Sequence, residues 1–320
     1  MQELPVFVAG HRGLLGSALV RELKARSFTR LITKTHSELD LADQSAVDEF
    51  FRRERPRAVL LAAAKVGGIE SNNRNRWEFL YENLAIQNNV LGCALKYDVP
   101  HLVFFGSSCI YPKHAEQPIR EEYLLTGPLE PTNEPYAIAK IAGLKLVEAA
   151  AAQYGRRWLS LMPTNLYGPG DNFDLITSHV LPAMIRKFHE AKVSQEQGLA
   201  ASVKLWGTGS ALREFLHVDD AARAACDLMV GGYSGLYNVG SGDELSIRAL
   251  ADLVSRVVGY SGTVEWDASR PEGTPRKLVD SSRLRATGWE PRTSLEVGIR
   301  QTYEWYQTHS KVLVSTGPSS

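Results

Sequence analysis

The sequence contains few cysteines. Only Cys93, Cys109 and Cys226 occur among 320 residues, and no two of them form a Cys-x-x-Cys pair. An odd, widely spaced set of this kind argues against both a disulfide framework and a zinc site. Such cysteine usage is typical of a reducing compartment, so we expect a cytoplasmic protein with no bound metal.

The sequence also lacks an excess of either charge and any long apolar run. Its 36 basic and 36 acidic residues cancel, which leaves no basic field for a nucleic-acid partner. Apolar stretches such as residues 60–64 and 149–152 stop far short of the roughly 18 residues that cross a bilayer, so we expect no membrane association. The first residues do not resemble a secretory signal. A composition of 44% hydrophobic and 22% charged residues indicates instead a folded globular chain.

Short apolar runs alternate with stretches of helical periodicity. The predicted strands are residues 6–9, 31–34, 58–64, 101–105 and 158–162. The predicted helices are residues 17–26, 43–53, 77–97, 136–154, 217–230 and 246–258. This alternation predicts an α/β fold with a Rossmann-type, doubly wound parallel sheet. Residues 110–135 contain five prolines and are predicted to form a long loop.

The texture of the sequence changes after residue 163, where Gly and Pro turns become more frequent. We therefore expect a cofactor-binding domain over residues 1–166, to which residues 217–240 return. A smaller mixed α/β substrate-binding domain would comprise residues 167–216 and 241–314, followed by a flexible tail over residues 315–320.

A glycine-rich turn follows the first predicted strand directly. It reads Gly10-His11-Arg12-Gly13-Leu14-Leu15-Gly16 and leads into the first predicted helix. Glycines let the turn close and let the backbone approach a pyrophosphate, whose charge is met by the N-terminus of the helix. The position of this turn therefore predicts a dinucleotide site.

The end of the second predicted strand indicates which dinucleotide binds. No carboxylate stands there to accept a hydrogen bond from a ribose 2′-hydroxyl, whereas Lys34, His36 and Arg12 suit a 2′-phosphate and hence NADP(H). Taken singly, each of these cations can also be plain surface charge. Asp40 and Leu41 are predicted to line the adenine, and the small residues 62–64 would let the cofactor lie flat.

Tyr136 and Lys140 are spaced i, i+4, which places a phenol and an ammonium on one helical face. A nearby ammonium is expected to lower the pKa of the tyrosine and make it a proton donor or acceptor for a carbonyl or alcohol. Ser107 follows the fourth predicted strand, at the sheet edge where open α/β folds bind ligands.

The glycine turn, Ser107 and the Tyr136–Lys140 pair, in this order, resemble the extended short-chain dehydrogenase/reductase family over almost the whole chain. The resemblance implies that Ser107 bonds the substrate carbonyl oxygen, Tyr136 transfers the proton and Lys140 holds the nicotinamide ribose. It also implies cofactor contacts from Ala63, Phe105, Gly106, Ser108, Pro163, Thr164, Asn165, Leu166 and His179.

Cys109 stands two residues after Ser107. A thiol there is either a small buried hydrophobe or a base beside a ketone. The stretches 62–69, 107–112, 131–136, 163–168 and 213–220 are similar to one branch of the family. Members of that branch use NADPH for the 3,5-epimerisation and 4-keto reduction of GDP-4-keto-6-deoxy-D-mannose to GDP-L-fucose. The resemblance implies that Cys109 removes the protons at C3 and C5 and that His179 returns a proton from the other face.

The same resemblance implies substrate contacts from Lys187, Trp206, Arg213, Glu272 and Lys277. It further implies a homodimer formed by the helices over residues 77–97 and 136–154. The sequence departs from many relatives at His36, where they have arginine, and at Lys187 and Glu272, where the charge is kept but the length changes. We expect His36 to weaken the preference for NADP.

Two other functions stay open at this point. One is a sugar-nucleotide 4-epimerase or dehydratase that recycles bound NAD(H), and Cys109 with His179 argues against it. The other is a non-catalytic NADP-sensing scaffold, against which the intact Ser107, Tyr136 and Lys140 argue.

Overall fold

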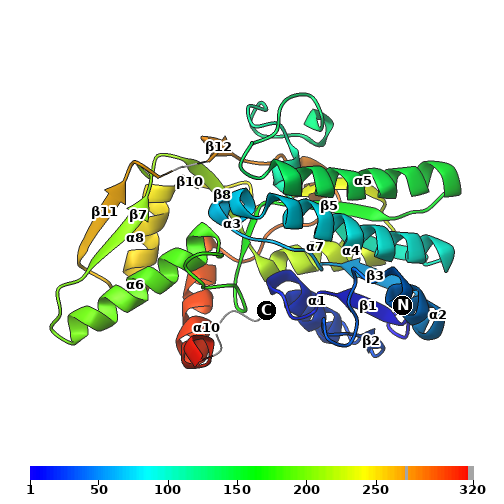
Figure 1. Cartoon of the computed structure of the whole chain (residues 1–320), viewed down its shortest axis with the longest axis horizontal. Coiled ribbons are helices and arrows are strands. Elements are labelled where there is room, and N and C mark those ends of the chain that lie inside the picture. The colour runs from blue at the N-terminus through cyan, green and yellow to red at the C-terminus, as the bar shows by residue number, and fades with distance from the viewer. Residues whose placement is uncertain (271–272, 316–320) are drawn as a thin grey trace.

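The computed structural model describes residues 1–270 and 273–315 (Figure 1). Its main element is a parallel sheet of six strands in the order β2-β1-β3-β4-β5-β9. The strands are β1 (Val6–Ala9), β2 (Leu31–Ile32), β3 (Ala58–Leu61), β4 (His101–Phe105), β5 (Leu159–Pro163) and β9 (Gly235–Val239). The predicted doubly wound α/β fold is confirmed. No helix in the described part of the chain is long and apolar enough to cross a membrane.

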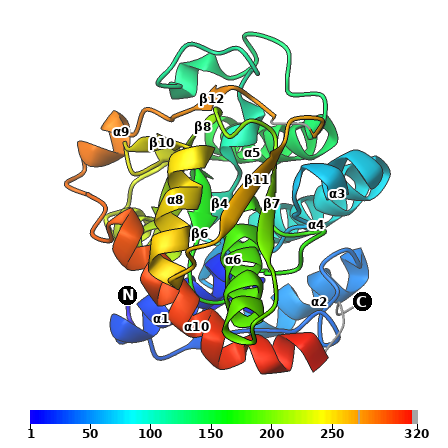
Figure 2. The ribbon, with the colours of Figure 1, turned by 90° about the vertical axis from the view of Figure 1, so that its left-hand side faces the viewer.

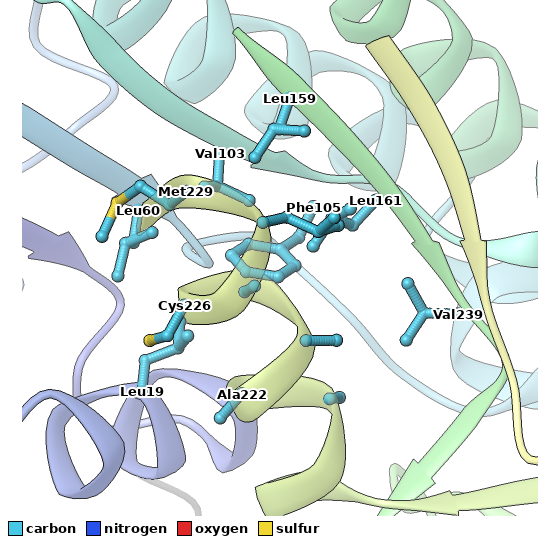
Figure 3. Packing of buried hydrophobic residues seen from close by; sticks show 14 of the residues in the cluster. Leu19, Leu60, Val103, Phe105, Leu159, Leu161, Ala222, Cys226, Met229 and Val239 are labelled. Carbon is cyan, nitrogen blue, oxygen red and sulfur yellow. The ribbon is translucent and has the colours of Figure 1, made fainter. Parts of the chain in front are cut away.

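Helices cover both faces of this sheet, as Figure 1 shows. One face carries α1 (Leu14–Ala25) and α7 (Val218–Val230), and the other carries α2 (Gln44–Glu54), α4 (Arg76–Lys96) and α5 (Glu134–Tyr154). Figure 3 shows Ala222, Cys226 and Met229 of α7 against the side chains of the central strands. The strands are apolar on both sides because each side is covered by helices.

The second region lies at one end of the molecule, at the left of Figure 1. Strand β8 (Leu212–His217) pairs with β6 (Asn165–Tyr167), β10 (Glu244–Ser246) and β12 (Arg276–Lys277), while β7 (Ser202–Trp206) pairs with β11 (Thr263–Asp267). Helices α6 (Val180–Glu196), α8 (Ile247–Val258) and α10 (Leu295–Ser315) pack around a separate apolar core, and Figure 2 shows α10 running beside α6 and α8. The short helices α3 (Ile69–Arg74) and α9 (Ser282–Arg285) complete the fold.

Several elements end earlier or later than predicted. Strand β3 stops at Leu61, which pairs with Ala9, the last residue of β1, whereas β2 stops at Ile32, which pairs with Phe7. Helix α1 begins three residues early, directly after Gly13. The predicted tail begins at residue 315, but Ser315 is the last residue of α10, and residues 316–320 lie outside the described residues.

The proline-rich loop after β4 is irregular, as predicted, with 3₁₀ turns at Ser108–Ile110 and Glu121–Tyr123. Asn238 of β9 anchors it. Its Oδ1 accepts from the Tyr111 hydroxyl at 2.6 Å, its Nδ2 donates to the Ile119 carbonyl at 2.9 Å, and its backbone N–H donates to Glu121 Oε1 at 2.9 Å. These buried bonds hold the loop, and with it the turn that contains Cys109, at the carboxyl end of the sheet.

Candidate active site

The glycine turn leaves room only for backbone. Gly10 adopts φ +82°, and a Cβ there would lie 2.7 Å from the Ala63 backbone. A Cβ on Gly16 would lie 2.0 Å from the carbonyl oxygen of Gly10. Between them, His11 buries an Nδ1 atom that has no partner among the described residues. The close packing of backbone against backbone in this turn and the N-terminus of α1 fit the diphosphate of a dinucleotide.

The cations predicted to select NADP stand beside carboxylates. His36 Nδ1 lies 3.7 Å from Asp40 Oδ1, and Lys34 Nζ lies 3.9 Å from Glu38 Oε1. Both pairs, like Arg12, are at the surface at the end of β2, and Leu41 packs with Ala63 against the core. Part of the positive charge is therefore offset by carboxylates from the same segment.

The turn after β4 carries Ser107, Ser108 and Cys109. A Cβ on Gly106 would lie 2.3 Å from the Met162 sulfur, so the chain passes here without a side chain, directly after the buried Phe105. Ser107 Oγ caps the 3₁₀ turn by accepting from the Cys109 N–H at 3.3 Å. The Cys109 side chain is 7% exposed, and this burial raises the pKa of the thiol. Lys277, Ser107 and Lys140 act in the opposite direction.

Helix α5 places Lys140 one helical turn after Tyr136. Lys140 is 3% exposed, its Nζ donates to the Phe105 carbonyl at 2.9 Å and lies 5.8 Å from the centre of the Tyr136 ring. Burial lowers the pKa of Lys140 to about 8. The pKa of Tyr136 is raised, first by burial and then by Cys109, so the prediction of a lowered tyrosine pKa was wrong for this structure. The ammonium is held at a backbone carbonyl, and desolvation of the phenol dominates.

His179 is the N-cap of α6 and directly follows residues that contact the segment after β3. The Gly68 N–H donates to the Thr177 carbonyl at 3.0 Å, and a Cβ on Gly68 would lie 2.7 Å from the Ser178 oxygen. Desolvation of the imidazole by the surrounding protein, together with Lys277, lowers the pKa of His179. Lys277 therefore lies within electrostatic range of both His179 and Cys109.

The predicted substrate residues fall into two groups. Lys277 of β12 pairs in register with Arg213 of β8, and its side chain lines a small cavity beside Cys109. Lys187 and Trp206 form an outer group, since Lys187 Nζ donates to the Lys204 carbonyl of β7 at 2.8 Å, two residues before Trp206. The Arg270 guanidinium lies 5.1 Å from the Trp206 ring centre. Glu272 lies outside the described residues.

Comparison with known proteins decides the family. The model of the NAD dependent epimerase/dehydratase family matches residues 6–240. The chain belongs to this family. GDP-L-fucose synthase 1 of Arabidopsis thaliana is 57% identical over 303 residues, which cover 94% of this chain and 92% of that protein. GDP-L-fucose synthase of Escherichia coli (strain K12) is 50% identical, with 96% and 97% covered.

A solved structure is also similar to this epimerase/dehydratase. MlghC, a GDP-mannoheptose C4 reductase from Campylobacter jejuni with NADP bound, is 39% identical, with a TM-score of 0.89 over 96% of this chain and 99% of that one. The likeness extends through the second region as well as the six-stranded sheet.

Two of the predicted cofactor residues of this family member use their side chains elsewhere. Thr164 Oγ1 and Asn165 Nδ2 both donate to the Glu214 carbonyl, at 3.2 and 2.8 Å. Of their neighbours, Pro163 is the last residue of β5 and Leu166 lies within β6. These side chains fasten β8 to the large sheet, and a cofactor contact from them stays a prediction.

Sequence reasoning missed several groups beside the thiol. A small cavity next to Cys109 is lined by Lys113, Glu130, Asn133 and Lys277 among others. Asn133 Oδ1 is buried there without a partner among the described residues. Asn133 belongs to the quoted stretch 131–136, which was the signal that could have found it, whereas Lys113 and Glu130 lie in a loop without periodicity.

Proposed function

We propose that this protein converts GDP-4-keto-6-deoxy-D-mannose to GDP-L-fucose, by 3,5-epimerisation and NADPH-dependent reduction at C4. The observation that carries the proposal is that the turn with Cys109 packs against α5, which carries Tyr136 and Lys140, so a carbon-acid base adjoins a proton donor for a carbonyl. The names of relatives at 57% and 50% identity support this substrate.

In the epimerisation, Cys109 removes the protons at C3 and C5, which the C4 ketone makes acidic, and His179 returns a proton on the opposite face. Burial favours the neutral thiol, and desolvation together with Lys277 favours the neutral imidazole in the free protein. Removal of a carbon-bound proton needs the thiolate, so the groups that stabilise the thiolate set the rate of this stage.

In the reduction, bound NADPH supplies the hydride to C4. Ser107 donates a hydrogen bond to the carbonyl oxygen, and Tyr136 protonates it. The raised pKa of Tyr136 keeps the phenol protonated, which is the form a donor requires. Lys140 would hold the nicotinamide ribose once it leaves the Phe105 carbonyl.

The binding groups fit a phosphorylated cofactor and a sugar nucleotide. Arg12, Lys34 and His36 would meet the 2′-phosphate of NADPH at the end of β2. Arg213 offers a planar fork to diphosphate oxygens, and Trp206 an aromatic face to the guanine. Residues 1–166 with 217–240 would form the cofactor domain, and residues 167–216 with 241–314 the substrate domain.

Two variants and two readouts test this function. Cys109→Ser should abolish exchange of solvent deuterium into C3 and C5 of the substrate, while Tyr136→Phe should keep the exchange and lose NADPH oxidation by at least about a hundredfold. A wild type that exchanges but does not oxidise NADPH would indicate an epimerase or dehydratase. A wild type that does neither would indicate a scaffold.

A C4 reductase without epimerase activity is the second candidate. The similarity to a GDP-mannoheptose C4 reductase favours it, as does the burial that keeps the Cys109 thiol protonated. NADPH oxidation by the wild type without any deuterium at C3 or C5 would support this candidate and overturn the epimerisation.

We also propose a homodimer formed through α4 and α5. Trp77 and Tyr81 stack on each other while 70% and 59% exposed, and Ile138 and Leu146 are exposed on α5. Light scattering on a sizing column should give twice the chain mass for the wild type and the chain mass for Tyr81→Glu. A monomeric wild type would refute the proposal. A reactive Cys109 needs reducing surroundings, which supports a cytoplasmic location.

A further inference from the structure

We propose that the Lys277 ammonium is the electrostatic partner of the Cys109 thiolate. The Lys113–Glu130 ion pair prevents Glu130 from pairing with Lys277 instead. The catalytic meaning of this charge arrangement rests on the proposed function, in which Cys109 is the base. The arrangement itself belongs to the free protein and is testable without substrate.

The cavity beside Cys109 brings these four groups together from three places in the chain. Cys109 follows β4, Lys113 and Glu130 come from the two ends of the proline-rich loop, and Lys277 comes from β12. The register of β12 on β8 fixes the backbone of Lys277. The anchoring of the loop on Asn238 fixes the start of the loop that carries Lys113.

The carboxylate in this cavity already has a partner. Glu130 Oε2 lies 2.9 Å from Lys113 Nζ in a pair that is mostly buried, and Glu130 Oε1 accepts from the Thr132 hydroxyl at 3.3 Å. Among the residues that the structure describes, no carboxylate oxygen lies within 4.0 Å of the Lys277 ammonium. Among the described anions that act on Lys277, the thiolate of Cys109 has the larger effect and Glu130 the smaller.

Each member of the proposed pair, taken alone, pays a desolvation free energy when it is charged. Burial raises the pKa of Cys109 and lowers that of Lys277, and each residue shifts the other back toward its charged form. An ion pair offsets part of the desolvation of both charges. The thiolate–ammonium form is thus favoured over either charge by itself.

Other charged and polar groups face the pair. Ser107 and Lys140 also favour the thiolate, and Tyr136 of α5 adjoins it. Around Lys277, the Arg213 guanidinium opposes the ammonium and Glu130 favours it, while His179 has its own proton affinity lowered by Lys277. These groups come from the turn after β4, α5, β8, the proline-rich loop and the start of α6.

Lys113 has a positioning role in this arrangement although it does not act on the thiol directly. Without Lys113, the Glu130 carboxylate would be left in the cavity with Lys277 as the cation within reach. A carboxylate is a far stronger competitor for the ammonium at neutral pH than a thiol, since it is ionised already. Loss of Lys113 should therefore reduce the thiolate, and loss of Glu130 as well should restore it.

The test is the pH dependence of alkylation at Cys109 by iodoacetamide, quantified by mass spectrometry of the peptide that contains it. Only the thiolate reacts, forming a sulfur–carbon bond as iodide leaves. At pH 7, Lys277→Met should react about tenfold more slowly than wild type, with its profile moved to higher pH, and Lys277→Arg should keep most of the rate. Lys113→Met should be slower than wild type, while Lys113→Met/Glu130→Gln should return to it.

Controls and contrary outcomes are distinct. Glu49→Gln removes a carboxylate paired with Arg52 on the outside of α2 and should leave the rate unchanged. A folded Lys277→Met, judged by its melting temperature, that reacts at the wild-type rate would overturn the pairing. A double variant as slow as Lys113→Met would overturn the role of Lys113. If the alkylation rates follow the prediction but wild type shows no exchange at C3 and C5, the charge pair stands and the proposed function falls.

Discussion

Replacing Lys140 by methionine should abolish the reduction and yet stabilise the protein. A fall of the lysine pKa from 10.5 to about 8 corresponds to about 3 kcal/mol of lost stability at neutral pH. Methionine keeps most of the buried stem, but the Phe105 carbonyl loses a hydrogen bond worth about 1–2 kcal/mol. The net expectation at pH 7 is a gain of about 1–2 kcal/mol in the free energy of unfolding.

The sign of the pH dependence makes this prediction sharp. Between pH 8 and 10.5 the unfolded chain holds the lysine proton more tightly than the folded protein does, so wild-type stability rises with pH through this window. The advantage of Lys140→Met should therefore be largest at and below pH 7 and shrink steadily toward pH 10.

Urea denaturation of both proteins at pH 7, 8, 9 and 10 measures this difference, and every titrating group that does not interact with Lys140 cancels in it. Lys145→Met, which removes an exposed lysine paired with Glu148 on the same helix, serves as control and should change stability by less than about 0.5 kcal/mol at each pH. A Lys140→Met protein that is less stable than wild type, or a difference that stays constant from pH 7 to 10, would refute the reasoning.

Three further predictions follow from the fold and the cofactor turn. Gly16→Ala would place a Cβ 2.0 Å from a backbone oxygen, so calorimetry should show NADPH affinity reduced by at least about tenfold, whereas Gly92→Ala, whose Cβ meets nothing, should bind normally. His36→Arg should raise the ratio of kcat/KM for NADPH to that for NADH about tenfold, and an unchanged ratio would remove His36 from the phosphate site. Asn238→Leu leaves the Tyr111 hydroxyl and a loop carbonyl buried without partners, and should reduce the free energy of unfolding by about 2–4 kcal/mol in urea titrations; a loss under about 1 kcal/mol would contradict the anchor.

The sequence predicted the framework of the large sheet well. Strands β1 and β4 have the predicted bounds, because each is a short apolar run that ends at a turn with glycine. Helix α6 was not predicted, although Leu181, Met184, Ile185 and Phe188 recur at helical spacing and are buried. Its signal was overlooked among the Gly and Pro turns on either side. The end of β3 could not be predicted, since it depends on where the neighbouring strand β1 ends.

The site was predictable in its membership more than in its electrostatics. The order of motifs indicated Ser107, Tyr136 and Lys140, the resemblance indicated Cys109, and the structure brings them to one edge of the sheet. The direction of the Tyr136 pKa shift was not predictable, because spacing along a helix does not show that the ammonium bonds a carbonyl of another strand. The Lys113–Glu130 pair spans 17 residues of irregular loop, which no periodicity describes.

The late position of β9 in the sequence affects how the large sheet folds during synthesis. The sheet's last strand and the helix α7 that covers one of its faces come from residues 218–239, after the chain has already passed through α6, β7 and β8. A nascent chain that has reached residue 166 has an open edge on β5 and an uncovered apolar face over Val103, Phe105 and Leu161. The six-stranded sheet therefore cannot be completed during synthesis until about three quarters of the polypeptide has left the ribosome.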